Sequence, residues 1–162
     1  VISEEAAYVT INFMQGVTEH GSGARLRHAG LEENNYVYKK VVTGYPYIFE
    51  NPIAGKTGTT QNQSDGWFMG IVPNLLTGVW VGGEDRSIHF EEIAFGQGAT
   101  MALPIWALYM KGAYENDSLG ISKEDFLTPK IVSIPLDCEE YEIDADPNLP
   151  DKIEADLDQL GF

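Results

Sequence analysis

The sequence is poor in cysteine, in basic residues and in long apolar runs, and each shortage excludes a class of protein. Its one cysteine, Cys138, cannot form an internal disulfide, and no zinc-binding spacing is present. Ten Lys and Arg residues stand against 25 Asp and Glu residues, which gives a net charge of −15. Nucleic-acid binding needs a basic face that releases counterions, so that class is excluded. No run of about 18 apolar residues occurs, so we expect no membrane segment in this chain.

The remaining composition is that of an ordinary globular domain. The chain has 162 residues, of which 43% are hydrophobic and 22% are charged. It begins with Val1 rather than Met. We therefore expect a piece of a longer protein, whose missing targeting signals say nothing about its location.

Local patterns predict a helix near the N-terminus. Ser3 is a candidate N-cap, and glycines at positions 21 and 23 are expected to end the helix. Its apolar residues recur at helical spacing: Ala7, Ile11, Met14 and Val17. Residues 36–43 are aromatic and β-branched enough to form a strand.

The middle of the chain predicts an antiparallel meander. Three β-rich runs, residues 53–60, 66–72 and 77–83, are separated by short turn-forming connections. Residues 101–114 are apolar nearly all round, which is typical of a helix buried on more than one side, and we expect it to lie across the sheet. Thr100 is its expected N-cap, with Pro104 in the first turn. The predicted fold class is α+β, an antiparallel sheet with packed helices.

The most informative stretch is Ala54-Gly55-Lys56-Thr57-Gly58-Thr59-Thr60. A nucleotide-binding P-loop would need glycine where this chain has Glu50, whose carboxylate would repel phosphate. It would also need a helix directly after the motif, and Gly58 and the polar residues that follow are a poor helix start. The nucleotide interpretation is therefore disfavoured.

The same stretch resembles the Lys-Thr-Gly motif of penicillin-binding proteins and serine β-lactamases, which lies on a strand beside a nucleophilic serine. The chain is similar over roughly residues 3–114 to the C-terminal part of the transpeptidase domain of class A (bifunctional) penicillin-binding proteins. The further matching segments are Gly21-Ser22-Gly23 (Gly-Thr-Gly-like in that family), Asp65-Gly66-Trp67-Phe68, Val79-Trp80-Val81-Gly82 and Ala102-Leu103-Pro104-Ile105-Trp106.

The resemblance implies a partial penicillin-binding transpeptidase or β-lactamase-like fold over residues 1–128. Residues 129–162 match nothing and form an acidic C-terminal extension. The implied parent cross-links peptidoglycan stem peptides ending in D-Ala-D-Ala through an acyl-serine, and it binds β-lactam antibiotics. It lies on the periplasmic face of the inner membrane, anchored by an N-terminal segment absent here. No cofactor and no metal are expected.

The resemblance also assigns roles to the motif. Lys56 and Thr59 are the expected catalytic residues, and Thr57, Gly58 and Thr59 the expected substrate-binding residues. Lys56 attracts the substrate carboxylate, and the two threonine hydroxyls hydrogen-bond it. Gly58 allows close approach of neighbouring structure. The Thr59 backbone N–H supplies half of an oxyanion hole, and the strand edge pairs with the extended substrate.

Two other motifs of the family are missing. No serine in this chain is followed by lysine three residues on, or by asparagine two residues on. In the family both motifs precede Lys-Thr-Gly. We therefore expect that this chain alone cannot be acylated and that its main partner is the N-terminal half of the same domain, without which apolar surface is exposed.

Other side chains receive ordinary interpretations, and two other functions stay open. Asp65 is expected to cap a turn. The residues Trp67, Phe68, Trp80 and Trp106 are expected to pack in the core rather than to bind carbohydrate. The histidines His20, His28 and His89 show no metal spacing, and Asp144, Asp146 and Asn148 form an incomplete calcium loop. The alternatives are a non-catalytic cell-envelope binding module of the same fold and a serine β-lactamase.

Overall fold

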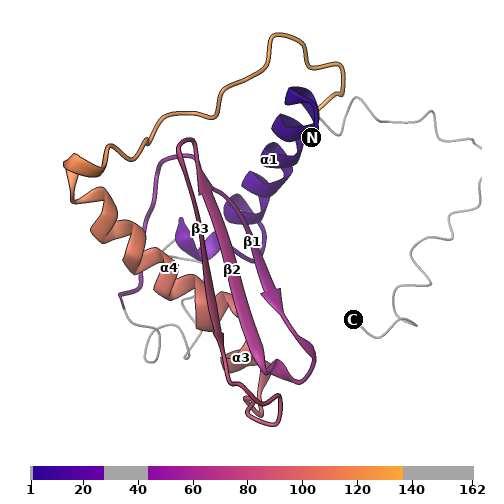
Figure 1. Ribbon diagram of the computed structural model, residues 1–162, viewed down its shortest axis with the longest axis vertical. Helices are drawn as coiled ribbons and strands as arrows, with labels where there is room; N and C mark the ends of the chain where they lie inside the picture. Colours follow the sequence, from indigo (N-terminus) through magenta and orange to yellow (C-terminus); the bar gives the residue numbers. More distant parts are fainter. Residues whose placement is uncertain (1, 28–43, 137–162) are drawn as a thin grey trace, which may run out of the picture. The chain divides into compact units, whose positions relative to one another are not determined.

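The computed structural model describes residues 2–27 and 44–136 (Figure 1). The chain divides into two compact units, Val1–Ile131 and Val132–Phe162, and the following account concerns the first. The predicted strand at 36–43 and the incomplete calcium loop lie outside the described residues. The predicted domain division after residue 128 stays a prediction.

The N-terminal helix α1 spans Glu4–Glu19, and Ser3 is its N-cap as predicted. The Ser3 hydroxyl oxygen accepts a hydrogen bond of 3.1 Å from the Ala6 backbone N–H, which satisfies one of the free donors of the first turn. The predicted apolar face is only half-buried, and the buried residues of the helix are Val9 and Thr18. A short 3₁₀ turn, Ala24–Leu26, follows.

The sheet is the predicted meander. Its strands are β1 (Ala54–Thr59), β2 (Asp65–Val72) and β3 (Leu75–Gly82), hydrogen-bonded in the order β1-β2-β3 with both pairs antiparallel. A 3₁₀ turn at Gln61–Gln63 and a two-residue turn at 73–74 make the connections. Burial alternates along β2, as expected of a strand with one covered face.

The long helix α4 spans Gly98–Tyr114 and follows the short helix α3, Ile93–Gly96. The predicted N-cap was wrong, because the helix begins two residues before Thr100 and its N-cap is Gln97. Pro104 accordingly lies inside the helix and not in its first turn. A 3₁₀ turn at Asp117–Leu119 follows α4.

Helix α4 packs against β2 and β3. Phe49, from the segment before β1, packs against Trp106 and Tyr114 of the same helix, so the predicted burial on more than one side is confirmed. The remaining side is open, with Ile105, Leu108 and Tyr109 49%, 40% and 50% exposed. Over the described residues, the stretch Ile93–Tyr114 is long and apolar enough to cross a membrane by length and composition alone. More than half of its most apolar 18-residue window is buried within the fold, as in the core helix of a soluble protein.

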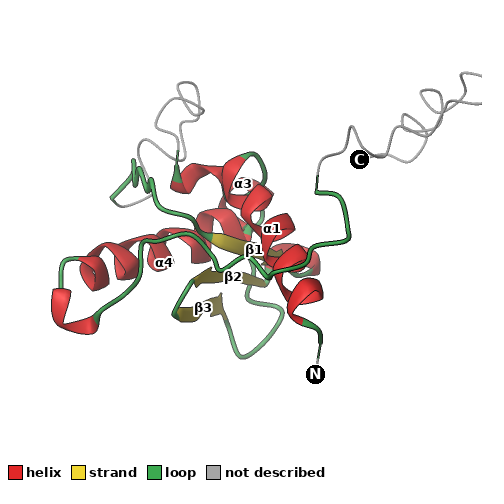
Figure 2. Cartoon of the chain, turned by 90° about the horizontal axis from the view of Figure 1, so that it is seen from above, coloured by secondary structure: helices red, strands yellow, loops and turns green. Residues whose placement is uncertain are grey.

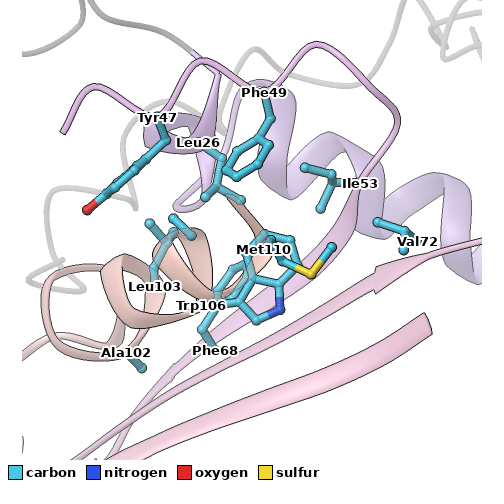
Figure 3. Close-up of a cluster of buried hydrophobic side chains, with 11 residues drawn as sticks. Leu26, Tyr47, Phe49, Ile53, Phe68, Val72, Ala102, Leu103, Trp106 and Met110 are labelled. Carbon is cyan, nitrogen blue, oxygen red and sulfur yellow. The ribbon is translucent and has the colours of Figure 1, made fainter. Parts of the chain in front are cut away.

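The core lies between α4, β2 and the segment that precedes β1 (Figure 3). Trp106 is fully buried, and its ring meets that of Phe68 edge-on, with ring centres 5.2 Å apart. Phe49 adds a second edge contact with Trp106 at 6.1 Å. Gly70 makes room for the indole, because a Cβ at this position would lie 2.3 Å from the Trp106 ring. The remaining fully buried side chains of this core include Leu26, Ile53, Val72, Leu103 and Met110.

Arg27 fastens the segment before β1 to α1. Its guanidinium donates to the backbone oxygens of Asn51 at 2.7 Å and Phe49 at 3.3 Å, and to the Thr18 hydroxyl at 3.3 Å. Partial burial lowers the pKa of Arg27, and the nearby charge of Glu19 opposes that shift. The start of β1 is thus held by charge-assisted hydrogen bonds.

Candidate functional site

The motif residues Lys56, Thr57, Gly58 and Thr59 all lie on β1, which is an edge strand among the described residues. Figure 1 shows β1 at one side of the sheet, with β2 between it and β3. Its hydrogen-bonding groups on the side away from β2 have no strand partner in the described part of the chain. The predicted strand position of the motif is therefore confirmed.

The register fixes which backbone groups face this open edge. The Thr60 backbone N–H donates to the Asp65 backbone oxygen at 3.1 Å, and Thr59 pairs with Gly66. In an antiparallel pair, the groups of successive residues point alternately toward the partner strand and away from it. The N–H and C=O of Thr57 and Thr59 therefore point toward the open edge.

The side chain of Lys56 lies on the outer face of the sheet, the face opposite α4. Lys56 pairs with Met69, so both side chains share one face, while the buried Phe68 on the other face contacts the α4 residue Trp106. Lys56 is exposed, and its Nζ donates to the Thr57 backbone oxygen at 2.8 Å. The ammonium group therefore sits at the open edge itself.

The hydroxyl of Thr57 is hydrogen-bonded to that of Ser22, with the two oxygens 2.6 Å apart. Ser22 lies in the glycine-flanked turn that follows α1. The sequence had singled out this turn as the end of the helix and as a family match, and had given Ser22 no role. The structure brings Ser22 to the motif across 35 residues of sequence.

Thr59 is tied to the start of α4. Its hydroxyl oxygen accepts a hydrogen bond of 3.0 Å from the backbone N–H of Gly98, the first residue of that helix. Gly98 has no room for a side chain, because a Cβ would lie 2.3 Å from the Gly58 oxygen and 2.5 Å from the Trp67 oxygen. Since Thr57 and Thr59 share one face of β1, the end of α1 and the start of α4 lie on the same face of the sheet. Figure 2 shows these helices against the strands from above.

Gly58 lies between the two threonines and faces the other way. A Cβ at Gly58 would be 3.2 Å from the Trp67 Cβ, so a larger residue would crowd the neighbouring strand. Gly58 and Trp67 are register partners. The close approach expected of this glycine is thus an approach to β2.

Asp65 holds the hairpin between β1 and β2. One carboxylate oxygen accepts from the Trp80 indole N–H at 3.0 Å, and the other accepts from the Thr60 hydroxyl at 3.1 Å. The Asp65 N–H in turn donates to the Thr60 hydroxyl at 3.0 Å. These contacts agree with the predicted turn-capping role.

The outer face of the sheet carries large exposed side chains. Trp67 and Trp80 are 44% and 47% exposed, and their rings lie 6.4 Å apart at a tilt of 46°. Leu76 on the same face is 61% exposed. The prediction of core packing was therefore wrong for these two tryptophans, whereas Phe68 and Trp106 are fully buried. The outer face of the sheet is therefore apolar and exposed in the described structure.

Four hollows of the described surface are lined by residues outside β1. One of about 550 Å³ is lined by α1 and residues 126–130, with Tyr8 and Thr128 joined there by a hydrogen bond of 3.3 Å. In the described ranges, no three His, Cys, Asp or Glu side chains gather in a metal-binding group.

The chain is similar in sequence to several curated proteins, although no protein-family model matches it. The chain is 31% identical to penicillin-binding protein 1A of Pseudomonas aeruginosa over 138 residues, 85% of this chain and 14% of that protein. It is 32% identical to penicillin-binding protein 1A of Clostridium tetani over 116 residues, 72% of this chain and 12% of that protein. For the Aquifex aeolicus protein of the same name the identity is 36% over 83 residues, 49% of this chain and 11% of that protein.

The fold has a solved counterpart as well. The crystal structure of penicillin-binding protein 1A from Haemophilus influenzae superposes with a TM-score of 0.56 and 25% identity, covering 80% of this chain and 17% of that one. The predicted α+β class, an antiparallel sheet with packed helices as in part of a penicillin-binding transpeptidase, is thereby confirmed. The chain spans only 11% to 14% of the length of the three curated relatives.

Proposed function

Because this chain is related in sequence and in fold to penicillin-binding protein 1A, we propose that it forms one wall of a D-Ala-D-Ala transpeptidase site used in peptidoglycan synthesis. The observation that carries the proposal is the open edge of β1, where the ammonium of Lys56, the hydroxyl of Thr57 and the N–H of Thr59 come together. The catalytic serine is supplied by the half of the domain that precedes this chain in the longer protein.

The reaction proposed for that longer protein proceeds in two acyl transfers. The serine oxygen attacks the penultimate carbonyl of a stem peptide, an ester C–O bond forms, and the C–N bond to the terminal D-Ala breaks as its nitrogen takes up a proton. The amine of a second stem then attacks the ester, forms an amide and returns the proton to the serine. A β-lactam enters the same first step, and its ring C–N bond breaks.

Each group on β1 has a distinct task in this scheme. An extended stem peptide pairs with the free edge of β1 through backbone hydrogen bonds. The N–H of Thr59, which points toward that edge, donates to the developing oxyanion. Lys56 and the hydroxyls of Thr57 and Thr59 hold the terminal carboxylate, by charge and by hydrogen bonds. Gly58 keeps β1 close to β2.

The test compares the chain alone with the longer protein that carries it, using a fluorescent penicillin. Lys56→Ala in the longer protein should slow labelling by about 100-fold or more, the size of effect seen when one electrostatic group of an acyl-transfer site is removed. The unfolding midpoint should stay unchanged, because Lys56 is exposed and its hydrogen bond within the described residues goes to Thr57 on its own strand. The chain alone should remain unlabelled.

The matched control is Lys130→Ala, which removes another exposed lysine from a segment outside the sheet. Its labelling should equal that of the unaltered protein. Labelling of the isolated chain, or equal rates for Lys56→Ala and Lys130→Ala, would refute the proposal. An unlabelled longer protein would favour a non-catalytic binding module, and rapid loss of the label would favour a β-lactamase.

A further inference from the structure

Ser22 is held in place by the turn on either side of it. The N–H groups of Gly21 and Gly23 donate to the backbone oxygens of Gly16 and Val17 at 3.1 and 2.9 Å, so the turn folds back on the end of α1. A Cβ at Gly21 would lie 2.9 Å from the Val17 backbone, and one at Gly23 would lie 3.2 Å from the Val17 oxygen. Gly21 therefore leaves no room for a side chain and Gly23 leaves little, and Ser22 between them is exposed.

The end of α1 is fastened to β1 at two points. The buried Thr18 hydroxyl donates to the Ile53 oxygen at 2.6 Å, just before β1 begins. Four residues later on both segments, the hydroxyls of Ser22 and Thr57 meet at 2.6 Å. Both pairs have the same separation of 35 residues, so the two segments run alongside each other in register. These two hydrogen bonds between the end of α1 and the β1 segment thus fix the position of the Ser22 hydroxyl.

The Ser22–Thr57 pair has one hydroxyl proton left for a ligand. Each hydroxyl has one proton, and one of the two protons is used in the bond between them. Whichever residue donates, the other keeps its proton for an acceptor at the edge of β1. That edge also presents the Lys56 ammonium, bonded to the Thr57 oxygen at 2.8 Å. A hydroxyl held by a partner is better prepared for an anion than one that rotates freely.

We propose that Ser22 is a positioning residue, which orients the Thr57 hydroxyl toward the carboxylate of the donor peptide or of a β-lactam. The inference rests on the proposed function and deepens it, because it adds a residue from outside β1 to the recognition of the ligand carboxylate. The ligand chemistry is that of an anionic acyl donor. Ser22 itself forms no bond to the reacting carbonyl.

The experiment uses the longer protein and two matched probes, benzylpenicillin and its methyl ester, in which a neutral methyl ester replaces the charged carboxylate. The second-order acylation rate constant is measured for each. Ser22→Ala should lower the rate with the acid by about 3- to 10-fold, the worth of one hydrogen bond, and change the rate with the ester by less than about twofold. Ser22→Thr should restore the acid rate, and Ser22→Ala combined with Thr57→Val should be no slower than Thr57→Val alone.

The control is Ser118→Ala, which removes a hydroxyl that also makes a 2.6 Å hydrogen bond, to Asn116, but lies beyond α4. It should leave both rates unchanged. Equal slowing of the acid and the ester in Ser22→Ala would mean that Ser22 is merely structural, and an unchanged acid rate would also overturn the inference. The acid-to-ester ratio reports only on folded, reactive protein. If the unaltered protein reacts with neither probe, the proposed function itself fails.

Discussion

Replacing Gly98 by alanine should push α4 away from the motif strand. The added Cβ would lie 2.3 Å from the Gly58 oxygen and 2.5 Å from the Trp67 oxygen. Both are backbone atoms of paired strands, so neither can move aside as a flexible side chain would. The first turn of α4 must therefore shift, and the hydrogen bond from the Gly98 N–H to the Thr59 hydroxyl is lost or stretched.

The loss of stability in Gly98→Ala has two parts. Overpacking of a well-packed contact destabilises by about 1–3 kcal/mol, and the lost hydrogen bond adds about 1 kcal/mol. We therefore expect Gly98→Ala to lower the free energy of unfolding by about 2–4 kcal/mol. In the same helix, Gly112 is exposed and has no atom within 4 Å of an added Cβ. Gly112→Ala should stabilise by about 0.5–1 kcal/mol, since alanine favours the helix.

The assay is urea unfolding of the chain, followed by far-ultraviolet circular dichroism at several protein concentrations. The two variants carry the same substitution in the same helix, yet their midpoints should move in opposite directions. Midpoints that shift the same way, or a Gly98→Ala midpoint within error of the unaltered chain, would refute the close contact between α4 and β1.

Three further predictions concern stability. Ser3→Ala should cost about 1 kcal/mol in urea unfolding, because the Ala6 N–H loses its cap, and Ser3→Asp should not. Asp65→Ala should cost about 1–3 kcal/mol, since Trp80 and Thr60 lose their acceptor, whereas Asp65→Asn should cost less. Burial raises the pKa of Tyr114 above its ordinary 10.0, so its contribution to stability is complete below that pH and is lost as pH rises through the folded-state pKa. Tyr114→Phe should therefore lose less stability between about pH 9 and pH 11 than the unaltered chain; an equal loss would contradict the shift.

The local features of the fold could be predicted from the sequence. The meander was correctly predicted because alternating β-rich residues and short polar turns act over a few positions. The N-cap at Ser3 was predicted for the same reason. The start of α4 was misjudged, because its first N–H groups depend on Thr59, 39 residues away, and not on a local capping side chain. No pattern near Gly98 reveals that contact.

The sequence predicted the strand that carries the candidate site, but it did not predict which residues contact that strand. The motif marked Lys56 and its neighbours, and alternation correctly put Thr57 and Thr59 on one face. The contact of Thr57 with Ser22 depends on how α1 lies beside β1, which only tertiary packing decides. Trp67 and Trp80 were expected inside because aromatic strand residues usually pack, yet their face lacks a cover in the described structure.

That pair of tryptophans gives the protein a built-in optical reporter. Trp67 and Trp80 are half-exposed, while Trp106, the third tryptophan of the chain, is sealed in the interior. A soluble quencher such as iodide should reach the first two indoles and spare the third. A protein segment that binds to the outer face of the sheet would shield both indoles from the quencher and shift their fluorescence emission to shorter wavelength. Binding of the rest of the domain could therefore be followed without attaching a dye.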